Sequence, residues 1–255
     1  MLEFASALDI GRMRSNNEDS VALDADAQVA VLADGMGGYN AGEVASGMAT
    51  SLVCSTVVQW LGSHAAPTVR ELGQAMSRAV SQANRAIFDA SNAKPEFSGM
   101  GTTLVLVAVA GGQLVVGHVG DSRVYRLRGG QLQRLTRDHS LLQEQMDAGL
   151  ITPAQAARSA NRNLVTRALG VGPEVVLEAR DHSLVPDDLL LLCSDGLTDM
   201  VDDEGICDLL CHTHVSLQAA CDALVDAANA AGGRDNVSVV LVRAGLAPED
   251  ASPAF

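Results

Sequence analysis

The 255-residue sequence is poor in aromatic side chains and in positive charge. Aromatic residues make up 3% of the chain, so few flat side chains are present on which nucleic-acid bases could stack. The 17 Lys and Arg residues are outnumbered by 31 Asp and Glu, which gives a formal net charge of −14. Nucleic acids and anionic membranes attract basic surfaces. The composition therefore argues against either as the main partner.

Paired cysteines and long apolar runs are also lacking. No two cysteines form a CxxC pair and their number is odd, so the sequence predicts neither a disulfide framework nor a zinc site. No run approaches the ~18 apolar residues of a membrane-spanning helix, and the N-terminus lacks the features of an export signal. We therefore expect reduced cysteines and a cytoplasmic location. The cysteines are Cys54, Cys193, Cys207, Cys211 and Cys221.

Hydrophobic residues make up 47% of the chain, enough for one sizeable core. Short β-rich runs end in glycine or polar turns, and the Gly-Gly pairs at 111–112 and 129–130 predict two hairpins. Helices are predicted where apolar residues recur at three- and four-residue spacing. The predicted helices are 42–62, 68–91, 139–148 and 216–231.

The order of these elements predicts the class of fold. Strands do not alternate regularly with helices, which favours an α+β fold with helices outside antiparallel sheets over a doubly wound parallel sheet. No linker divides the chain, so a single domain is predicted over residues 1–245. The polar, helix-prone stretch 138–169 interrupts the β pattern and is interpreted as an excursion from this domain. Residues 246–255 have the composition of a flexible tail.

A glycine-rich loop, VLADGMGGYNAGEVAS, covers residues 31–46. The dinucleotide fingerprint G-x-G-x-x-G fails because Asn40 stands where its last glycine should be. A P-loop fails because Glu43 and Val44 replace the Lys-Ser/Thr pair. Two interpretations stay open: a plain strand-to-helix turn, and a turn that brings the backbone close to a ligand.

Four aspartates share one local design, because each lies at an end of an apolar run. They are Asp34, Asp121, Asp195 and Asp235. Brought together unpaired, such carboxylates would repel one another, so a converging cluster needs cations. With no Cys or His interleaved, Mg²⁺ or Mn²⁺ suits the oxygen ligands better than zinc. Gly35, which has no side chain, could turn its carbonyl toward a metal that Asp34 also holds.

The N-terminal stretch GRMRSNNEDS places Arg14 four residues before Glu18, and Asp19 directly follows Glu18. These residues form either a solvated charge cluster or a functional one. In the functional interpretation Arg14 offers its guanidinium to a phosphate, and Glu18 or Asp19 supports a metal or its waters. The spacing does not decide between them.

Eight motifs occur in this order along the chain: RSNNEDS, LADGMGGYNAGEVAS, GMGTTLVLVAV, GHVGDSRVYRL, LTRDHSL, LTRALG, LLLCSDGLTDMV and GGRDNVSVVLV. Together they resemble the bacterial branch of the metal-dependent Ser/Thr protein phosphatases, the type 2C or PPM family, and the resemblance spans roughly residues 4 to 243. The resemblance implies a four-layer α/β/β/α sandwich of two antiparallel sheets flanked by helices. It also implies hydrolysis of phosphoserine and phosphothreonine by a metal-activated water.

The resemblance also implies roles for particular residues. Asp34 would bridge two tightly bound Mn²⁺ or Mg²⁺ ions, and the Gly35 carbonyl would bind one of them. Asp195 and Asp235 would complete the pair, and Asp121 would hold a third, weaker ion together with Asp195. The substrate phosphate would be gripped by Arg14. Supporting roles are expected for Glu18, Asp19 and Asn236.

Two positions depart from relatives and leave the proton donor open. Animal members carry a His, proposed as the general acid, where this chain has Met36, and many bacterial relatives have a His where it has Tyr39. A water on the metals is the preferred donor. His139, in the RDHS motif, is interpreted as structural.

The expected partners are phosphorylated proteins, and by family analogy a Hanks-type Ser/Thr kinase or its targets. One alternative is a non-catalytic relative that binds phosphoproteins as a scaffold, although the key aspartates are all present. Another is a two-metal nuclease or phosphodiesterase, against which the charge of −14 weighs.

Overall fold

The computed structural model describes residues 2–38, 41–156, 159, 164–212 and 216–245. It contains two sheets in which all strand pairs are antiparallel. One sheet has the order β1-β11-β10-β7-β8 and the other β2-β3-β5-β6-β9, with β4 beside β3. The strands are β1 (Leu2–Asp9), β2 (Asp19–Asp24), β3 (Val29–Met36), β4 (Gly101–Thr102), β5 (Leu104–Ala110), β6 (Gln113–Val119), β7 (Arg123–Arg128), β8 (Gln131–Arg134), β9 (Glu178–Ser183), β10 (Leu189–Cys193) and β11 (Val237–Ala244).

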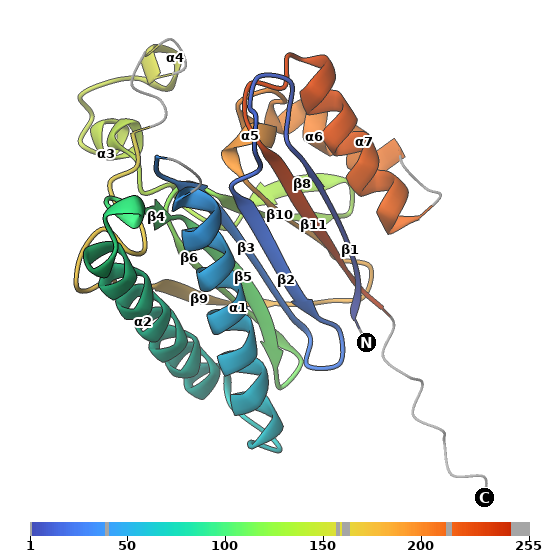
Figure 1. Cartoon of the computed structure of the whole chain (residues 1–255). Helices are drawn as coiled ribbons and strands as arrows, with labels where there is room; N and C mark the ends of the chain where they lie inside the picture. Colours follow the sequence, from blue (N-terminus) through green and yellow to red (C-terminus); the bar gives the residue numbers. More distant parts are fainter. Residues whose placement is uncertain (1, 39–40, 157–158, 160–163, 213–215, 246–255) are drawn as a thin grey trace, which may run out of the picture.

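Helices cover the outer face of each sheet (Figure 1). Two long helices pack on the sheet that contains β3, and the C-terminal helices pack on the sheet that contains β11. The predicted four-layer α/β/β/α sandwich is thereby confirmed. The helices are α1 (Ala41–Gly62), α2 (Val69–Ala93), the 3-10 helix η1 (Pro95–Phe97), α3 (Leu141–Asp147), α4 (Pro153–Ala156), α5 (Asp195–Thr198), α6 (Asp203–His212) and α7 (Leu217–Ala230).

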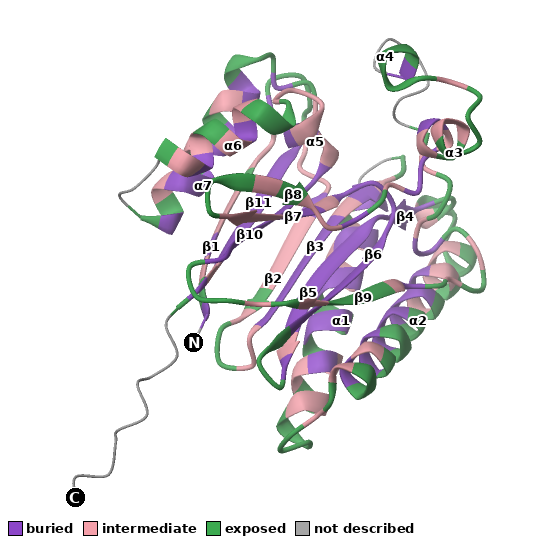
Figure 2. Ribbon diagram, turned by 180° about the vertical axis from the view of Figure 1, so that it is seen from behind, coloured by how far each residue is buried: buried purple, intermediate pink, exposed green. Residues whose placement is uncertain are grey.

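Three apolar cores hold the four layers together. Strand β3 contributes side chains to two of these cores. Val29 and Val31 face the core under α1 and α2, whereas Ala30 and Leu32 face the core between the sheets. Successive strand residues point to opposite faces, so a strand buried on both faces reads as a continuous apolar run. In Figure 2 the central strands are buried almost throughout, whereas β9 at the sheet edge is largely exposed.

Both predicted hairpins are confirmed. Gly111 and Gly112 join β5 to β6 with φ angles of +56° and +75°, and Gly129 and Gly130 join β7 to β8 with +56° and +76°. Two consecutive residues with positive φ are typical of the tight turns that match strand twist, and glycine adopts them without strain.

The predicted helices match α1, α2, α3 and α7, although α3 is shorter than expected. Caps explain where several begin: Thr68 and Glu71 form a reciprocal capping box at α2, and Ser216 caps α7. The sequence prediction missed α6 and the strands β1, β2 and β9. Strand β9 reads Glu-Ala-Arg-Asp-His-Ser, and its exposed polar side chains give no apolar pattern to detect.

Helix α1 is long and apolar enough, by length and composition, to cross a membrane. That differs from the expectation that no segment would approach such a length. In the fold, α1 packs on β2, β3 and α2 as a core helix. A core helix of this length can be as rich in apolar residues as a membrane-spanning one. All five cysteines are free, and Cys54, Cys193 and Cys221 are buried.

The excursion between β8 and β9 carries α3 and α4, which stand beyond the sheets near β4 (Figure 1). Ser140 caps α3 through its side chain, and an isolated antiparallel bridge joins Ser140 to Val165. The expected tail, 246–255, lies outside the described residues.

Candidate metal centre

The four aspartates from the ends of apolar runs line a single cavity of about 380 Å³. Asp34 lies near the end of β3, Asp121 follows β6, Asp195 follows β10, and Asp235 precedes β11. They therefore come from both sheets and meet at one end of the sandwich. The described lining residues are Arg14, Glu18, Asp34, Gly35, Met36, Gly37, Thr103, Asp121, Leu164, Val165, Asp195 and Asp235.

Thr103 positions two of these aspartates, a role that the sequence analysis did not assign. The Asp34 backbone N–H donates to Thr103 Oγ1 (3.0 Å), and the Thr103 N–H donates to the Asp34 carbonyl (2.8 Å). The same hydroxyl shares a 2.7 Å hydrogen bond with Ser122, the neighbour of Asp121. Thr103 thus links the Asp34 strand to the Asp121 loop. The GTT motif was visible in the sequence, but its spacing alone does not reveal this contact.

Asp195 and Asp235 are brought together by close packing between their segments. A Cβ on Gly196 would lie 1.9 Å from the Asn236 carbonyl oxygen, so only glycine fits directly after Asp195. The Asn236 side chain donates to the Ile10 and Asn16 carbonyls at 3.0 and 2.9 Å and accepts from the Glu18 N–H at 2.8 Å. Asn236 therefore ties the N-terminal loop to the start of β11.

Arg14 lies in the cavity and forms an ion pair with Asp235, with Nη2 and Oδ2 2.7 Å apart. Its side chain keeps 47% of its surface exposed. The guanidinium has five N–H donors, so one contact leaves others available to a phosphate. This placement is compatible with the predicted phosphate-binding role.

Glu18 and Asp19 take different positions. Glu18 lines the cavity, whereas Asp19 is buried behind it, opposite Asp34 in the β2–β3 pairing. Asp19 Oδ2 accepts a 2.8 Å hydrogen bond from Ser194, the residue before Asp195. Its Oδ1 is buried and lacks a hydrogen-bond partner among the described residues. Asp19 therefore supports the cavity wall, and Glu18 faces the interior.

Gly35 is required by packing. A Cβ there would lie 2.1 Å from the Gly42 carbonyl oxygen and 2.6 Å from that of Glu18. Real Cβ atoms do not approach backbone so closely, and the Gly35 N–H already donates to the Glu18 carbonyl (3.1 Å). The sequence analysis explained Gly35 by the freedom of its carbonyl. The structure adds a second reason, the close approach of α1 and residue 18 to β3.

The carboxylates of the cavity are costly to ionise together. Burial, followed by the charges of neighbouring aspartates, raises the pKa values of Asp34 and Asp195 well above the usual range. Burial also raises the pKa of Asp19 to about 6, and burial with the nearby Asp138 raises that of Asp121 to about 6. At neutral pH the charged cluster therefore destabilises the fold unless cations compensate it.

The residues of the cavity fit divalent metal ions. Five carboxylates face one guanidinium among the described lining residues, and these lining residues include neither a histidine nor a cysteine. Carboxylate and carbonyl oxygens are the ligands that Mg²⁺ and Mn²⁺ prefer. The raised pKa values and the unpartnered Asp19 Oδ1 mark an excess of negative charge that such ions would balance.

In metal-free protein, we expect Asp121→Asn to be more stable than wild type at pH 7, by about 3 kcal/mol, and this difference in stability to shrink toward pH 5. The folded-state pKa of Asp121 is raised to about 6. Between an unfolded pKa of ~3.9 and that value the folded state binds more protons, so stability falls as pH rises. The measurement is thermal unfolding of both proteins in EDTA. A gap that widens toward pH 5 would contradict the assignment.

Of the two positions that depart from relatives, Met36 lines the cavity, and Tyr39 lies outside the described residues. Leu164 and Val165, from the end of the excursion, form part of the cavity wall. His139 is buried and is not among the lining residues. The excursion thus borders the cavity, and His139 does not face it.

The sequence matches a family model described as protein phosphatase 2C over residues 12–228. It is 38% identical over 241 residues to the serine/threonine phosphatase stp of Listeria welshimeri, covering 93% of this chain and 94% of the relative. It is 36% identical to the protein phosphatase PhpP of Streptococcus pneumoniae, covering 94% of this chain and 97% of the relative.

Solved structures agree with these relatives. The serine/threonine phosphatase PstP/Ppp of Mycobacterium tuberculosis superposes with a TM-score of 0.86 at 37% identity, covering 96% of this chain and 99% of the other. The catalytic domain of PstP in complex with two manganese ions superposes with a TM-score of 0.82 at 37% identity, covering 95% of this chain and 97% of the other.

Proposed function

This chain belongs to the protein phosphatase 2C family, and we propose that the cavity lined by its four aspartates is where it hydrolyses phosphoserine and phosphothreonine in proteins. The observation that carries the proposal is the convergence of Asp34, Asp121, Asp195 and Asp235 in one acidic cavity beside Arg14. Residues 1–245 are proposed to form one catalytic domain, with 138–169 as a flap beside the active site.

We propose that Asp34, Asp195, Asp235 and the Gly35 carbonyl hold two divalent ions. Asp121 would hold a weaker third ion together with Asp195. Such ions supply an acidified water for attack on phosphorus and positive charge for the phosphoryl oxygens. The manganese in a solved relative supports Mn²⁺, and the oxygen-only ligand set also suits Mg²⁺.

Other residues in and behind the cavity wall bind the substrate phosphate or support the site. The exposed guanidinium of Arg14 would bind the phosphate through N–H groups that Asp235 leaves available. Asn236 holds the N-terminal loop in place, and Glu18 and Asp19 support the acidic wall. Because the described lining residues include no histidine, we propose that the leaving serine or threonine oxygen takes its proton from water in the cavity.

The test of this proposal is hydrolysis of p-nitrophenyl phosphate and of a phosphothreonine peptide with Mn²⁺, with Mg²⁺ and with EDTA. We expect turnover with the ions and none with EDTA. Metal-free folded protein that hydrolyses both substrates would contradict the metal-dependent site. Folded, metal-loaded protein that binds the peptide without turnover would indicate a scaffold.

We expect Arg14→Ala to raise the KM for a phosphothreonine peptide by about 10-fold or more, because it removes a charged hydrogen-bonding partner of the phosphate. The steady-state kinetics of the variant provide the measurement. Arg12→Ala is a matched control, since Arg12 is also exposed but does not line the cavity. An unchanged KM with lower kcat would instead place the Arg14 contact in the transition state.

We propose that the substrates are phosphorylated proteins in the cytoplasm, including a Hanks-type Ser/Thr kinase or its targets, within bacterial signalling. The net charge of −14 disfavours nucleic acid and anionic membrane surfaces as partners. Dephosphorylation of a purified kinase of this type, with DNA and RNA digestion as the contrasting assays, tests the assignment.

A further inference from the structure

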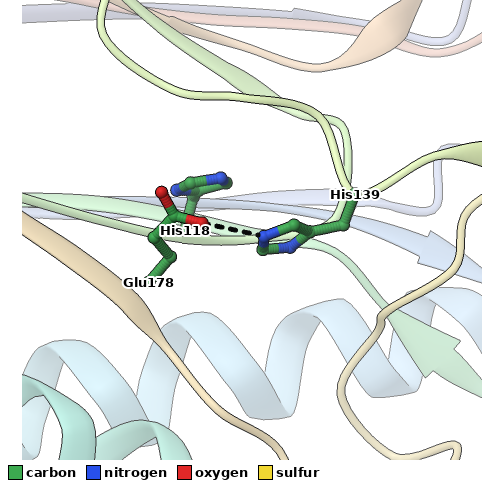
Figure 3. A group of neighbouring side chains, drawn as sticks. All are labelled: His118, His139 and Glu178. Carbon is green, nitrogen blue, oxygen red and sulfur yellow. Dashed lines mark hydrogen bonds and ion pairs between the residues drawn. The ribbon is translucent and has the colours of Figure 1, made fainter. Parts of the chain in front are cut away.

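Three neighbouring side chains outside the cavity form a compact cluster, of which the two histidines are buried. His118 comes from β6, His139 from the loop after β8, and Glu178 from β9 (Figure 3). One nitrogen or oxygen atom from each lies within 4.8 Å of the others. His118 and His139 are 3% and 6% exposed. Two histidines and a glutamate could hold a metal ion. The hydrogen bonds of the cluster show whether its ring nitrogens are available to one.

The hydrogen bonds and the ring geometry do not suit a metal. Gly120 donates its N–H to His139 Nδ1 (3.1 Å), so Nδ1 is unprotonated and the proton of the neutral ring sits on Nε2, which faces Glu178 Oε2 at 3.3 Å. That nitrogen therefore has no lone pair to offer. The two imidazoles are stacked, with centroids 4.6 Å apart and planes 15° apart. In such rings the in-plane lone pairs do not converge on one ion.

His139 instead holds the loop that carries Asp121. Its backbone N–H donates to the Gly120 carbonyl (2.9 Å), while its ring accepts from the Gly120 N–H. His139 thus binds both the backbone carbonyl and the backbone N–H of Gly120. Gly120 has φ of +104° and packs on Thr103, where a Cβ would lie 2.7 Å from the Thr103 side chain. The residue before Asp121 is therefore fixed between Thr103 and His139.

The ring itself is anchored on its far side. Glu178 accepts from Nε2 and is held in turn by Arg180 at 2.8 Å. His118 stacks on the ring, and its own Nε2 bonds the Arg137 carbonyl at 2.8 Å. Burial is the main cause that lowers the pKa values of both imidazoles. The His139 ring is thus held in one orientation and one tautomer.

The backbone of His139 also carries part of the cavity wall. Its carbonyl accepts the Thr166 N–H (2.8 Å), and the next-but-one residue, Leu141, donates to the Leu164 carbonyl (2.9 Å). Leu164 and Val165 line the cavity. His139 therefore connects the Asp121 loop to the Leu164–Thr166 segment, where the excursion returns to the sheets.

We propose that His139 is a positioning residue, which sets the place of Asp121 and of the Leu164–Thr166 segment relative to each other through its ring contact with Gly120. Its effect on metal binding rests on the proposed function of Asp121. His139 touches neither substrate nor metal in this role. The ring contact, and not the bulk of the side chain, is the element that the test must isolate.

Two near-isosteric variants separate the two sides of the ring. His139→Asn keeps an acceptor near Nδ1 and loses the donor to Glu178, whereas His139→Gln keeps a donor near Nε2 and loses the acceptor for Gly120. We expect His139→Gln to accelerate hydrogen exchange of the Gly120 amide. It should also raise the half-saturating Mn²⁺ concentration of the weakest site by about 10-fold, as typical for residues that support a metal ligand. His139→Asn should stay within about 2-fold of wild type in both.

The readouts are amide exchange by NMR and Mn²⁺ binding by calorimetry, with Asp121→Asn as the reference for the weakest site. The proposal would be overturned if His139→Gln showed wild-type amide exchange and Mn²⁺ binding. It would also be overturned if both variants lost Gly120 protection and Mn²⁺ affinity to the same extent. An Asp121→Asn protein that binds Mn²⁺ like wild type would refute the role of Asp121, and the Gly120 amide would still decide the role of His139. If His139→Gln does not fold, the wild-type ring decides: a protonated Nδ1 would overturn the proposal.

Discussion

Asp34→Asn is expected to abolish phosphatase activity while the fold is retained. Asp34 lies in the cavity among the other aspartates, and burial with their charges raises its pKa well above the usual range. An amide keeps the size of the side chain and removes the charge that would bridge two ions. Mutation of a residue that merely supports a metal ligand typically lowers metal affinity or activity by about 10- to 100-fold. Because Asp34 is proposed as a ligand itself, the loss in kcat/KM should exceed ~100-fold.

The measurement combines p-nitrophenyl phosphate turnover, Mn²⁺ calorimetry and thermal unfolding. Asp26→Asn is the matched control, because it makes the same chemical change at an exposed residue in the turn before β3, outside the cavity lining. It should leave turnover and Mn²⁺ binding unchanged. Near-normal turnover by folded, metal-loaded Asp34→Asn would refute the bridging role.

Gly35→Ala should disrupt both the fold around the cavity and the activity. The new Cβ would lie 2.1 Å from the Gly42 carbonyl oxygen and 2.6 Å from the Glu18 carbonyl oxygen. Both oxygens belong to the backbone, so no side-chain rotation can relieve the clash. Overpacking of a buried site typically costs about 1–3 kcal/mol and occasionally more. We expect the upper part of that range, because β3 and α1 would have to separate at the place where the cavity forms.

Gly38→Ala offers a control within the same motif. Among the described residues, a Cβ at Gly38 would meet no atom within 4 Å, so the unfolding temperature and turnover of Gly38→Ala should stay near wild type. Thermal unfolding and steady-state kinetics of the two variants provide the comparison. If Gly35→Ala were as stable and active as Gly38→Ala, close packing would not explain the glycine at position 35.

The periodic parts of the fold were accessible from the sequence because they follow local rules. The spacing of apolar residues predicted α1, α2 and α7, and the Gly-Gly pairs predicted two hairpins with positive φ. Strand β9 was missed because its side chains are polar and exposed, and only its pairing with β6 makes it a strand. Pairing of this kind is set by residues distant in the chain.

The four aspartates that carry most of the charge of the cavity could be identified from the sequence, because strand ends with a common Asp design are a local pattern. How these aspartates are held depends on contacts between distant parts of the chain. Thr103 forms hydrogen bonds with the Asp34 backbone and with Ser122. Gly35 and Gly196 leave room for the backbone of neighbouring segments. His139 binds the backbone N–H and carbonyl of Gly120. Each of these contacts joins segments that meet only after the two sheets have packed, so no local pattern encodes them.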